Sequence, residues 1–313
     1  MANVTAALVK ELREMTGAGM MDCKKALAAT DGDMDKAVDF LREKGLAGAQ
    51  KKAGRIAAEG VVATALTECG KKGVIVEVNA ETDFVAKNEK FTSYVAEVAA
   101  QALDTKAADI DAFLEETWAL DQSLTVNQKL SSMISVIGEN MHIRRFQQLR
   151  CDEGFVESYI HGGGKIGVLV AVESDVVNDA VKTMAKNICM QIAALKPLYT
   201  SDAEVSEEYL AKEREILKAQ IMNDPKESQK PEKVIDGMIQ GRIKKELKEI
   251  CLMDQVYVKA EDGKQSVKDY VASVAKAEGA KIAVKTFIRW ETGEGLEKKQ
   301  ENFAEEVAKQ MGA

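Results

Sequence analysis

The residues able to carry bond chemistry are few and scattered in this chain of 313 residues. It has two histidines, His142 and His161, and no arrangement of either with a serine or cysteine is typical of a nucleophilic site. The carboxylates follow the solvated faces of predicted helices, and no pair is isolated in an apolar setting suited to acid–base catalysis. The sequence therefore favours a protein that acts by binding. We interpret His142, in a predicted helix, as structural or solvated, and His161, at a predicted strand end, as exposed and able to contact a partner.

The cysteines do not form a metal-binding or disulfide framework. They are five in number, lie far apart, and never have C-x-x-C spacing. This pattern is typical of reduced thiols in a cytosolic protein, and it predicts that most of them are small core residues. No metal site is expected. The cysteines are Cys23, Cys69, Cys151, Cys189 and Cys251.

The segment 162–167 satisfies the G-x-G-x-x-G pattern literally. A dinucleotide-binding fingerprint follows a strand and opens a helix, whereas these glycines lead into a predicted strand at 168–172. A P-loop is also disfavoured, because Ile166 stands where a magnesium-binding Ser or Thr is needed. The segment therefore predicts a hairpin turn, and no cofactor is expected.

Two stretches of the chain, 60–79 and 154–173, read as copies of each other at an offset of 94 residues. Each has two β runs separated by a turn and followed by an apolar helix, which predicts a duplicated core. At the helix ends the offset has shrunk to 92, so the first copy has two extra residues in its strand-to-helix connection, 79–88. Loops that break the symmetry of a repeat are favoured places for function.

That connection contains Phe84. Thr82 or Asp83 can cap a short helix there, and Asn88 can end it. Phe84 then has two interpretations. It is either a hydrophobic staple folded onto the core, which is the commoner fate of an aromatic side chain, or a wedge held out on a rigid turn for a partner's pocket.

Periodicity predicts the elements on either side of the repeat. Helical spacing at 4–15, 22–29 and 33–45 indicates a compact three-helix module, followed by an Ala-, Gly- and Lys-rich linker. Residues 104–150 are predicted to be helical, with a loop near 121–126.

After the second copy, two apolar stripes interrupted by prolines predict an antiparallel helical hairpin in 201–251. We expect a strand at 255–259, a helix at 267–278, a strand at 281–290 and a last helix at 298–311. The apolar stripes of the hairpin are more extensive than two helices need for packing against each other. The hairpin could therefore support self-association as a homodimer, in the manner of a coiled coil.

The predicted fold class is α+β, with a UBA-like three-helix module, a duplicated β-hairpin-plus-helix core, an inserted helical hairpin and a C-terminal helix. A net charge of −8 spread along the chain argues against nucleic acid as a partner. No stretch approaches 18 apolar residues, so a cytoplasmic protein without a membrane partner is expected. The predicted domains are 1–54, 55–150, 151–200 with 252–290, 201–251 and 291–313.

Several segments, in order along the chain, resemble the bacterial translation elongation factor Ts family. The two longest are LREMTGAGMMDCKKAL at 12–27 and EVNAETDFVAK at 77–87. Shorter ones are IGEN at 137–140, SYIHG at 158–162 and FIR at 287–289. Matches of this length across the whole chain are specific, unlike a lone glycine pattern.

The resemblance implies a guanine-nucleotide exchange factor. Such a protein binds elongation factor Tu carrying GDP, disturbs its magnesium site and promotes GDP release so that GTP can bind. It implies that Phe84 pushes between two helices of the partner, together with Thr82, Asp83 and Val85. The further contacts that it implies are Lys24, Ile137, Gly138, His161 and Val258. The alternative, from another class, is a non-catalytic interaction scaffold or a chaperone-like adaptor that uses the same surfaces.

Overall fold

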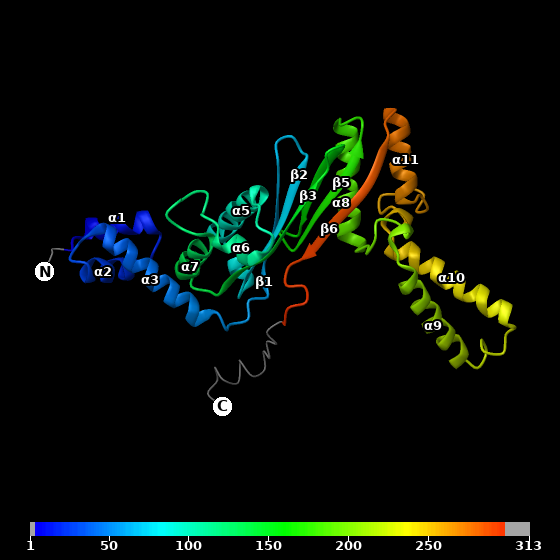
Figure 1. The fold of residues 1–313 in the computed structure, drawn as a ribbon, viewed down its shortest axis with the longest axis horizontal. Coiled ribbons are helices and arrows are strands. Elements are labelled where there is room, and N and C mark those ends of the chain that lie inside the picture. The colour runs from blue at the N-terminus through cyan, green and yellow to red at the C-terminus, as the bar shows by residue number, and fades with distance from the viewer. Residues whose placement is uncertain (1–3, 298–313) are drawn as a thin grey trace.

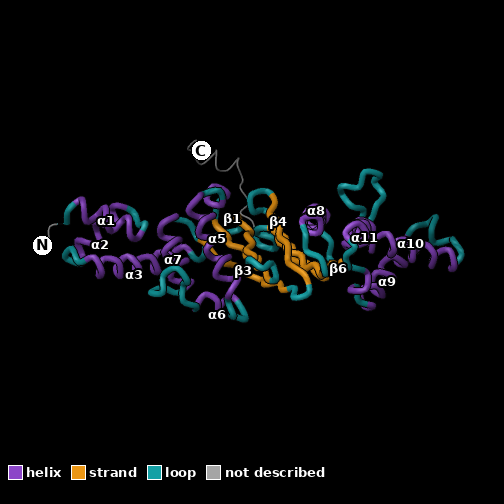
Figure 2. The backbone as a smooth tube through the Cα atoms, turned by 90° about the horizontal axis from the view of Figure 1, so that it is seen from above, coloured by secondary structure: helices purple, strands orange, loops and turns teal. Residues whose placement is uncertain are grey.

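The molecule is elongated, with helical units at both ends and two small sheets between them (Figure 1, Figure 2). The computed structural model describes residues 4–297. Helices and small antiparallel sheets are both present, so the predicted α+β class is confirmed. The helix predicted at 298–311 lies outside the described residues.

The N-terminal module consists of α1 (Ala6–Thr16), α2 (Met20–Ala29) and α3 (Met34–Lys52), as the periodicity predicts. Thr5 and Asp33 cap α1 and α3 with their side chains. The prediction that the third helix stops at Gly45 is wrong, because α3 continues through it and packs on a core helix. A Cβ on Gly45 would lie 3.8 Å from the backbone oxygen of Ser131, at ordinary van der Waals distance, so α3 passes close to the core helix at this point. Part of the predicted linker is therefore helical.

The first half of the core is a three-stranded antiparallel sheet of β1 (Glu59–Leu66), β2 (Lys72–Ala80) and β3 (Met141–Arg150), in that order. One face packs against the helices that follow β2, and Phe91, Tyr94 and Trp118 are buried there. These helices are α4 (Asp83–Ala86), α5 (Glu89–Asp104), α6 (Ile110–Glu115) and α7 (Val126–Ile137).

The prediction that residues 104–150 are helical, with a loop near 121–126, is wrong at its C-terminal end. Gly138, at φ 91°, ends α7, and residues 141–150 form the edge strand β3. His142 therefore lies on a strand and not in a helix. The spacing of Ile134, Ile137 and Met141 fits a helical face, but pairing with β2 decides the conformation of the last of them.

The second half repeats this arrangement with β4 (Gly154–His161), β5 (Ile166–Ser174) and β6 (Ile282–Glu291). Helices α8 (Asp179–Leu195) and α11 (Val267–Glu278) cover its outer face. Residues 162–165 form the predicted hairpin turn, α11 has the predicted bounds, and β6 agrees with the predicted strand to within a residue. The strand predicted at 255–259 is wrong: a 3-10 turn, η2 (Leu252–Asp254), is followed by a single bridge from Val256 to Ser266, because β6 occupies the available edge of β5.

The two halves are related by the predicted duplication and interlock reciprocally. The Val62 N–H donates to the Gly164 carbonyl at 2.7 Å, and the equivalent Val156 N–H donates to the Gly70 carbonyl at 2.7 Å. The inner faces of the two sheets bury a shared apolar cluster that includes Leu169. Each central strand is therefore covered on both faces, which explains its nearly continuous apolar run.

The predicted antiparallel hairpin is formed by α9 (Glu207–Asn223) and α10 (Glu232–Ile250), after a short 3-10 turn, η1 (Asp202–Glu204). It projects from the second half, at the end of the molecule opposite α1–α3 (Figure 1). Ile221, Ile235, Ile239 and Ile243 form a small core between its two helices. Among residues 4–297, no helix combines the length and apolar character needed to cross a membrane.

Candidate partner-binding surface

Phe84 is the most exposed large apolar side chain in the described part of the chain. It is 82% exposed, so it does not staple the connection to the core. Its neighbours Val85 and Ala86 instead pack against the cluster beneath the first sheet. The turn is thus anchored on one side by these two residues and presents Phe84 to solvent on the other.

The turn that carries Phe84 is capped as the sequence predicts. Thr82 has extended backbone angles, and its hydroxyl oxygen accepts the Val85 N–H at 3.3 Å. The other end differs in detail from the prediction. Lys87 is the C-cap of α4, and Asn88 caps the next helix by accepting the Lys90 N–H at 2.9 Å.

A residue that the sequence reasoning did not single out holds the cap. Glu139 accepts the Thr82 N–H at 3.0 Å through one carboxylate oxygen and the Thr82 hydroxyl at 2.7 Å through the other. Its neighbour Asn140 donates its N–H to the Glu81 carboxylate at 2.6 Å. Residues 139 and 140 therefore bind Glu81 and Thr82, the two residues that precede α4, by hydrogen bonds.

Asp83 remains an anion beside the exposed aromatic ring. The hydrogen bond and the charge of Lys87, whose Nζ lies 2.7 Å from a carboxylate oxygen, hold the pKa of Asp83 below its ordinary value. The charge of Lys165, in the turn between β4 and β5, acts in the same direction. Burial opposes this shift and is outweighed.

The structure brings two predicted contact segments together. Ile137 ends α7 and packs partly against the core, and exposed Gly138 takes left-handed backbone angles that turn the chain. This turn delivers Glu139 and Asn140 to the loop before Phe84. Segments far apart in sequence, 81–84 and 137–140, thus lie side by side and are joined by hydrogen bonds.

The other predicted contacts lie on separate elements. Lys24 is exposed on α2, in the N-terminal module. His161 is exposed at the end of β4, where its Nδ1 lies 3.0 Å from the hydroxyl of Tyr159. Val258, 47% exposed, precedes α11, and its N–H donates to Gln191 at 2.8 Å. The adjacent Lys259 turns back onto Asn187 at 2.7 Å, so its ammonium group is already partnered.

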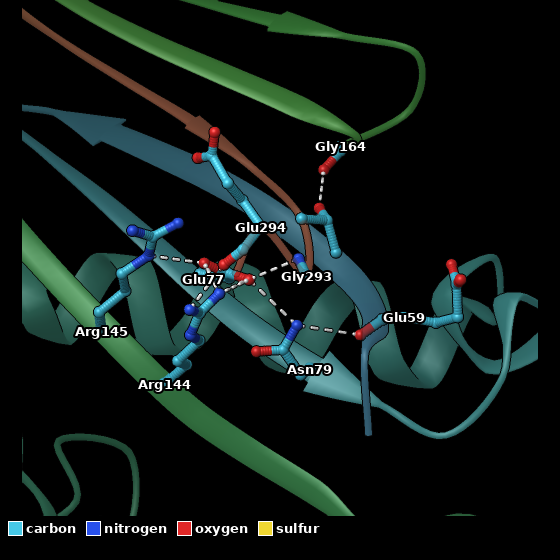
Figure 3. Close-up of polar contacts among 9 residues, drawn as sticks. Glu59, Glu77, Asn79, Arg144, Arg145, Gly164, Gly293 and Glu294 are labelled. Carbon is cyan, nitrogen blue, oxygen red and sulfur yellow. Dashed lines mark hydrogen bonds and ion pairs between the residues drawn. The ribbon is translucent and has the colours of Figure 1, made fainter. Parts of the chain in front are cut away.

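A buried ion cluster lies on the same strand that leads into the Phe84 turn. Glu77 is fully buried on β2, and its carboxylate accepts Arg144 at 3.0 Å, Arg145 at 2.6 Å and the Gly293 N–H at 2.8 Å (Figure 3). Asn79 donates to the same carboxylate and to the Glu59 carbonyl, both at 3.1 Å. The sequence signal was a single acid in the apolar run 73–78.

These contacts decide the ionisation of Glu77. Burial raises the pKa of Glu77, but the hydrogen bonds from Gly293 and Asn79 and the charge of Arg145 outweigh it and lower the pKa below 4.5. The carboxylate is therefore ionised at neutral pH. It joins strands β2 and β3 to the loop after β6.

The cysteines and acids show no further site within residues 4–297. All five cysteines are free, and four of them are buried, as the sequence predicts for core residues. No group of three or more His, Cys, Asp and Glu side chains in that part of the chain is arranged to hold a metal ion.

Comparison with known proteins gives one family. The sequence model of the family described as elongation factor Ts matches residues 81–294. Elongation factor Ts of Clostridium novyi (strain NT) is 52% identical over 308 residues, which cover 98% of this chain and 99% of the relative. Elongation factor Ts of Clostridium perfringens (strain SM101 / Type A) is 51% identical over 309 residues, covering 99% of both chains. The chain therefore belongs to the elongation factor Ts family, the nucleotide exchange factors of translation elongation.

Proposed function

We propose that this protein binds elongation factor Tu carrying GDP and promotes GDP release, with Phe84 acting as a wedge that disturbs the partner's magnesium site. The observation that carries the proposal is the pose of Phe84. An aromatic ring that is 82% exposed on a doubly capped turn has no role in the protein's own core. Such a ring is available to enter an apolar crevice of a partner.

The physics of exchange requires no bond chemistry in this protein. A protein that binds the nucleotide-free partner more tightly than the GDP-bound partner must weaken GDP binding by the same factor, because the two equilibria are linked. Burying one Phe contributes about 1.5–3 kcal/mol, and about 1.4 kcal/mol corresponds to tenfold in affinity. Phe84 alone therefore supplies only part of a large effect, and a broad interface supplies the rest.

The proposed contact set extends beyond the wedge. Thr82, Asp83 and Val85 accompany Phe84, and the Ile137–Gly138 turn lies beside them. Lys24 on the N-terminal module and the first core half would grip the partner's nucleotide-binding domain, while His161 and Val258 of the second half would meet another domain. The long shape of the molecule suits contacts spread over two domains (Figure 2).

The helical hairpin would support self-association into a homodimer or brace the second half, because it adds little to the core. The protein would act in the cytoplasm, where translation elongation occurs.

The test is release of fluorescently labelled GDP from purified elongation factor Tu. Adding this protein at catalytic concentration should increase the release rate, and free magnesium in excess should oppose the increase. The same measurement on a Phe84→Ala variant examines the wedge. An unchanged release rate on adding the wild-type protein contradicts the exchange function and would favour an interaction scaffold.

A further inference from the structure

The turn that carries Phe84 is too short to be stable without contacts to the rest of the fold. Helix α4 has 4 residues, and an isolated helix of this length is unstable in water because nucleation is unfavourable. Its pose must therefore come from tertiary contacts. Val85 and Ala86 supply an apolar anchor, and the polar anchor comes from the segment after α7.

Glu139 holds Thr82 through both of its carboxylate oxygens. One oxygen accepts the backbone N–H at 3.0 Å and the other accepts the hydroxyl at 2.7 Å. Because the hydroxyl gives its proton to Glu139, its lone pairs are left to accept the Val85 N–H, which is the bond that caps α4. Hydrogen bonds to a carboxylate are short and strong compared with neutral ones. Glu139 thus fixes both the backbone entering the turn and the rotation of the capping hydroxyl.

The residue after Glu139 extends this grip. The Asn140 N–H donates to Glu81 at 2.6 Å, and its side-chain amide donates to the carbonyl of Arg55 at 2.8 Å. The guanidinium of Arg55 also lies 3.3 Å from Glu81. Rotation of residues 81–82 relative to α7 would break several of these bonds at once.

From this geometry we infer that Glu139 is a positioning residue for nucleotide exchange. It acts through Thr82 on the angle at which Phe84 leaves the surface, and it makes the Phe84 turn and the Ile137–Gly138 turn one rigid contact surface. The inference rests on the proposed function, because it concerns the wedge. Displacing a group by a small distance from its productive position can cost much of a rate without abolishing binding.

The test compares Glu139→Ala, Phe84→Ala and the double variant in the labelled-GDP assay at saturating concentration. We expect Glu139→Ala to lower the maximal release rate about tenfold, which corresponds to about 1.4 kcal/mol. The conservative Glu139→Gln should lie between Glu139→Ala and wild type, because its amide keeps one acceptor oxygen. In the Phe84→Ala background, adding Glu139→Ala should cause no further loss, since residues in one unit are not additive.

The controls separate a positioning role from a loss of fold. Glu115→Ala removes an exposed carboxylate that makes no hydrogen bond within residues 4–297 and should leave the rate unchanged. Melting temperatures of all variants are measured, and if Glu139→Ala does not fold, Glu139→Gln replaces it in the double variant. Hydrogen exchange of the Val85 amide should speed up in the Glu139 variants, which direct partner contact by Glu139 would not explain.

The outcomes distinguish this inference from the proposed function. If Phe84→Ala releases GDP slowly and Glu139→Ala releases it at the wild-type rate, the positioning role is overturned and the wedge proposal stands. Equal losses from Glu139→Ala in the wild-type and Phe84→Ala backgrounds also overturn it, because Glu139 would then act independently of Phe84. Wild-type rates in both single variants overturn the wedge and the positioning role together.

Discussion

The carboxylate of Glu77 accepts the backbone N–H of Gly293, 216 residues later in the chain, at 2.8 Å. A Cβ on Gly293 would lie 2.1 Å from the Ala58 carbonyl oxygen, so only glycine allows the loop to approach this closely. The guanidinium of Arg144 bonds to Glu77 and also to the Glu294 carbonyl at 2.7 Å. The loop after the second half's last strand is thereby fastened to the central strand of the first half (Figure 3).

Replacing Glu77 should destabilise the fold strongly. Glu77→Ala leaves the partly buried Arg144 and Arg145 without their shared carboxylate, and breaking a buried ion pair in this way costs about 3–5 kcal/mol. Urea unfolding at pH 7 measures the change. Glu173→Ala is the control, because its carboxylate makes a more exposed pair with Lys285 and its loss should cost about 1 kcal/mol or less. Equal losses in both variants would contradict a special role for the buried cluster.

The contribution of Glu77 should also depend on pH. Its pKa is lower in the folded protein than the ordinary 4.5, so its contribution to stability is present above that value and is lost as pH falls through the folded-state pKa. The difference in unfolding free energy between wild type and Glu77→Gln should thus be constant near neutral pH and shrink below pH 4.5. Urea titrations at several pH values measure it. A difference that grows in acid contradicts the lowered pKa.

Phe84→Ala should separate function from stability. A core staple would lose about 3–5 kcal/mol on truncation, whereas a side chain that is 82% exposed should leave the melting temperature nearly unchanged. The rate of GDP release from the complex should fall, with a smaller loss in binding. Calorimetric melting and labelled-GDP release measure the two effects. If Phe84→Ala is strongly destabilised but each folded molecule exchanges GDP normally, the wedge hypothesis is contradicted.

Replacing the hairpin should spare exchange. The structure sets where it can be cut, because the Leu198 N–H donates to the Ile250 carbonyl and the Tyr209 hydroxyl donates to Glu246 at 2.6 Å. A variant with a short Gly/Ser linker in place of 211–244 keeps both contacts. It should fold and exchange at saturating concentration, and lose any self-association in analytical ultracentrifugation. A folded variant without exchange activity would show that the hairpin is part of the exchange surface.

The N-terminal module should contribute affinity. Lys24→Ala removes an exposed charge and is expected to raise the dissociation constant for elongation factor Tu up to about tenfold with an unchanged melting temperature. Lys10→Ala, on α1, is the matched control. Deleting residues 1–54 should weaken binding further but also lower the melting temperature, because α3 packs on α7. Calorimetry measures the dissociation constant of each variant for elongation factor Tu. A dissociation constant that is unchanged after the deletion contradicts the docking role.

Local sequence determined those features that depend on neighbouring residues. Apolar periodicity, caps and glycine turns specify the helices and hairpins, so the three-helix module, the duplicated core and the α9–α10 hairpin were predictable. The helix cap at Thr82 and the place of Phe84 in the first turn of α4 also follow from local sequence, because the capping hydrogen bond joins Thr82 to Val85, three residues later. Local reasoning correctly predicted helix up to Ile137, but it continued the helix past Gly138 to residue 150 and was wrong there.

Tertiary structure alone decided whether Phe84 is buried, since both interpretations share one local sequence. It also decided that Glu139 meets Thr82 across 57 residues and that Glu77 meets Gly293 across 216. Such contacts follow from strand register and from the docking of one sheet on another, which no short segment encodes. The sequence by itself thus specified a capped turn bearing an aromatic ring. Packing between distant segments determined that the ring faces solvent and what holds it there.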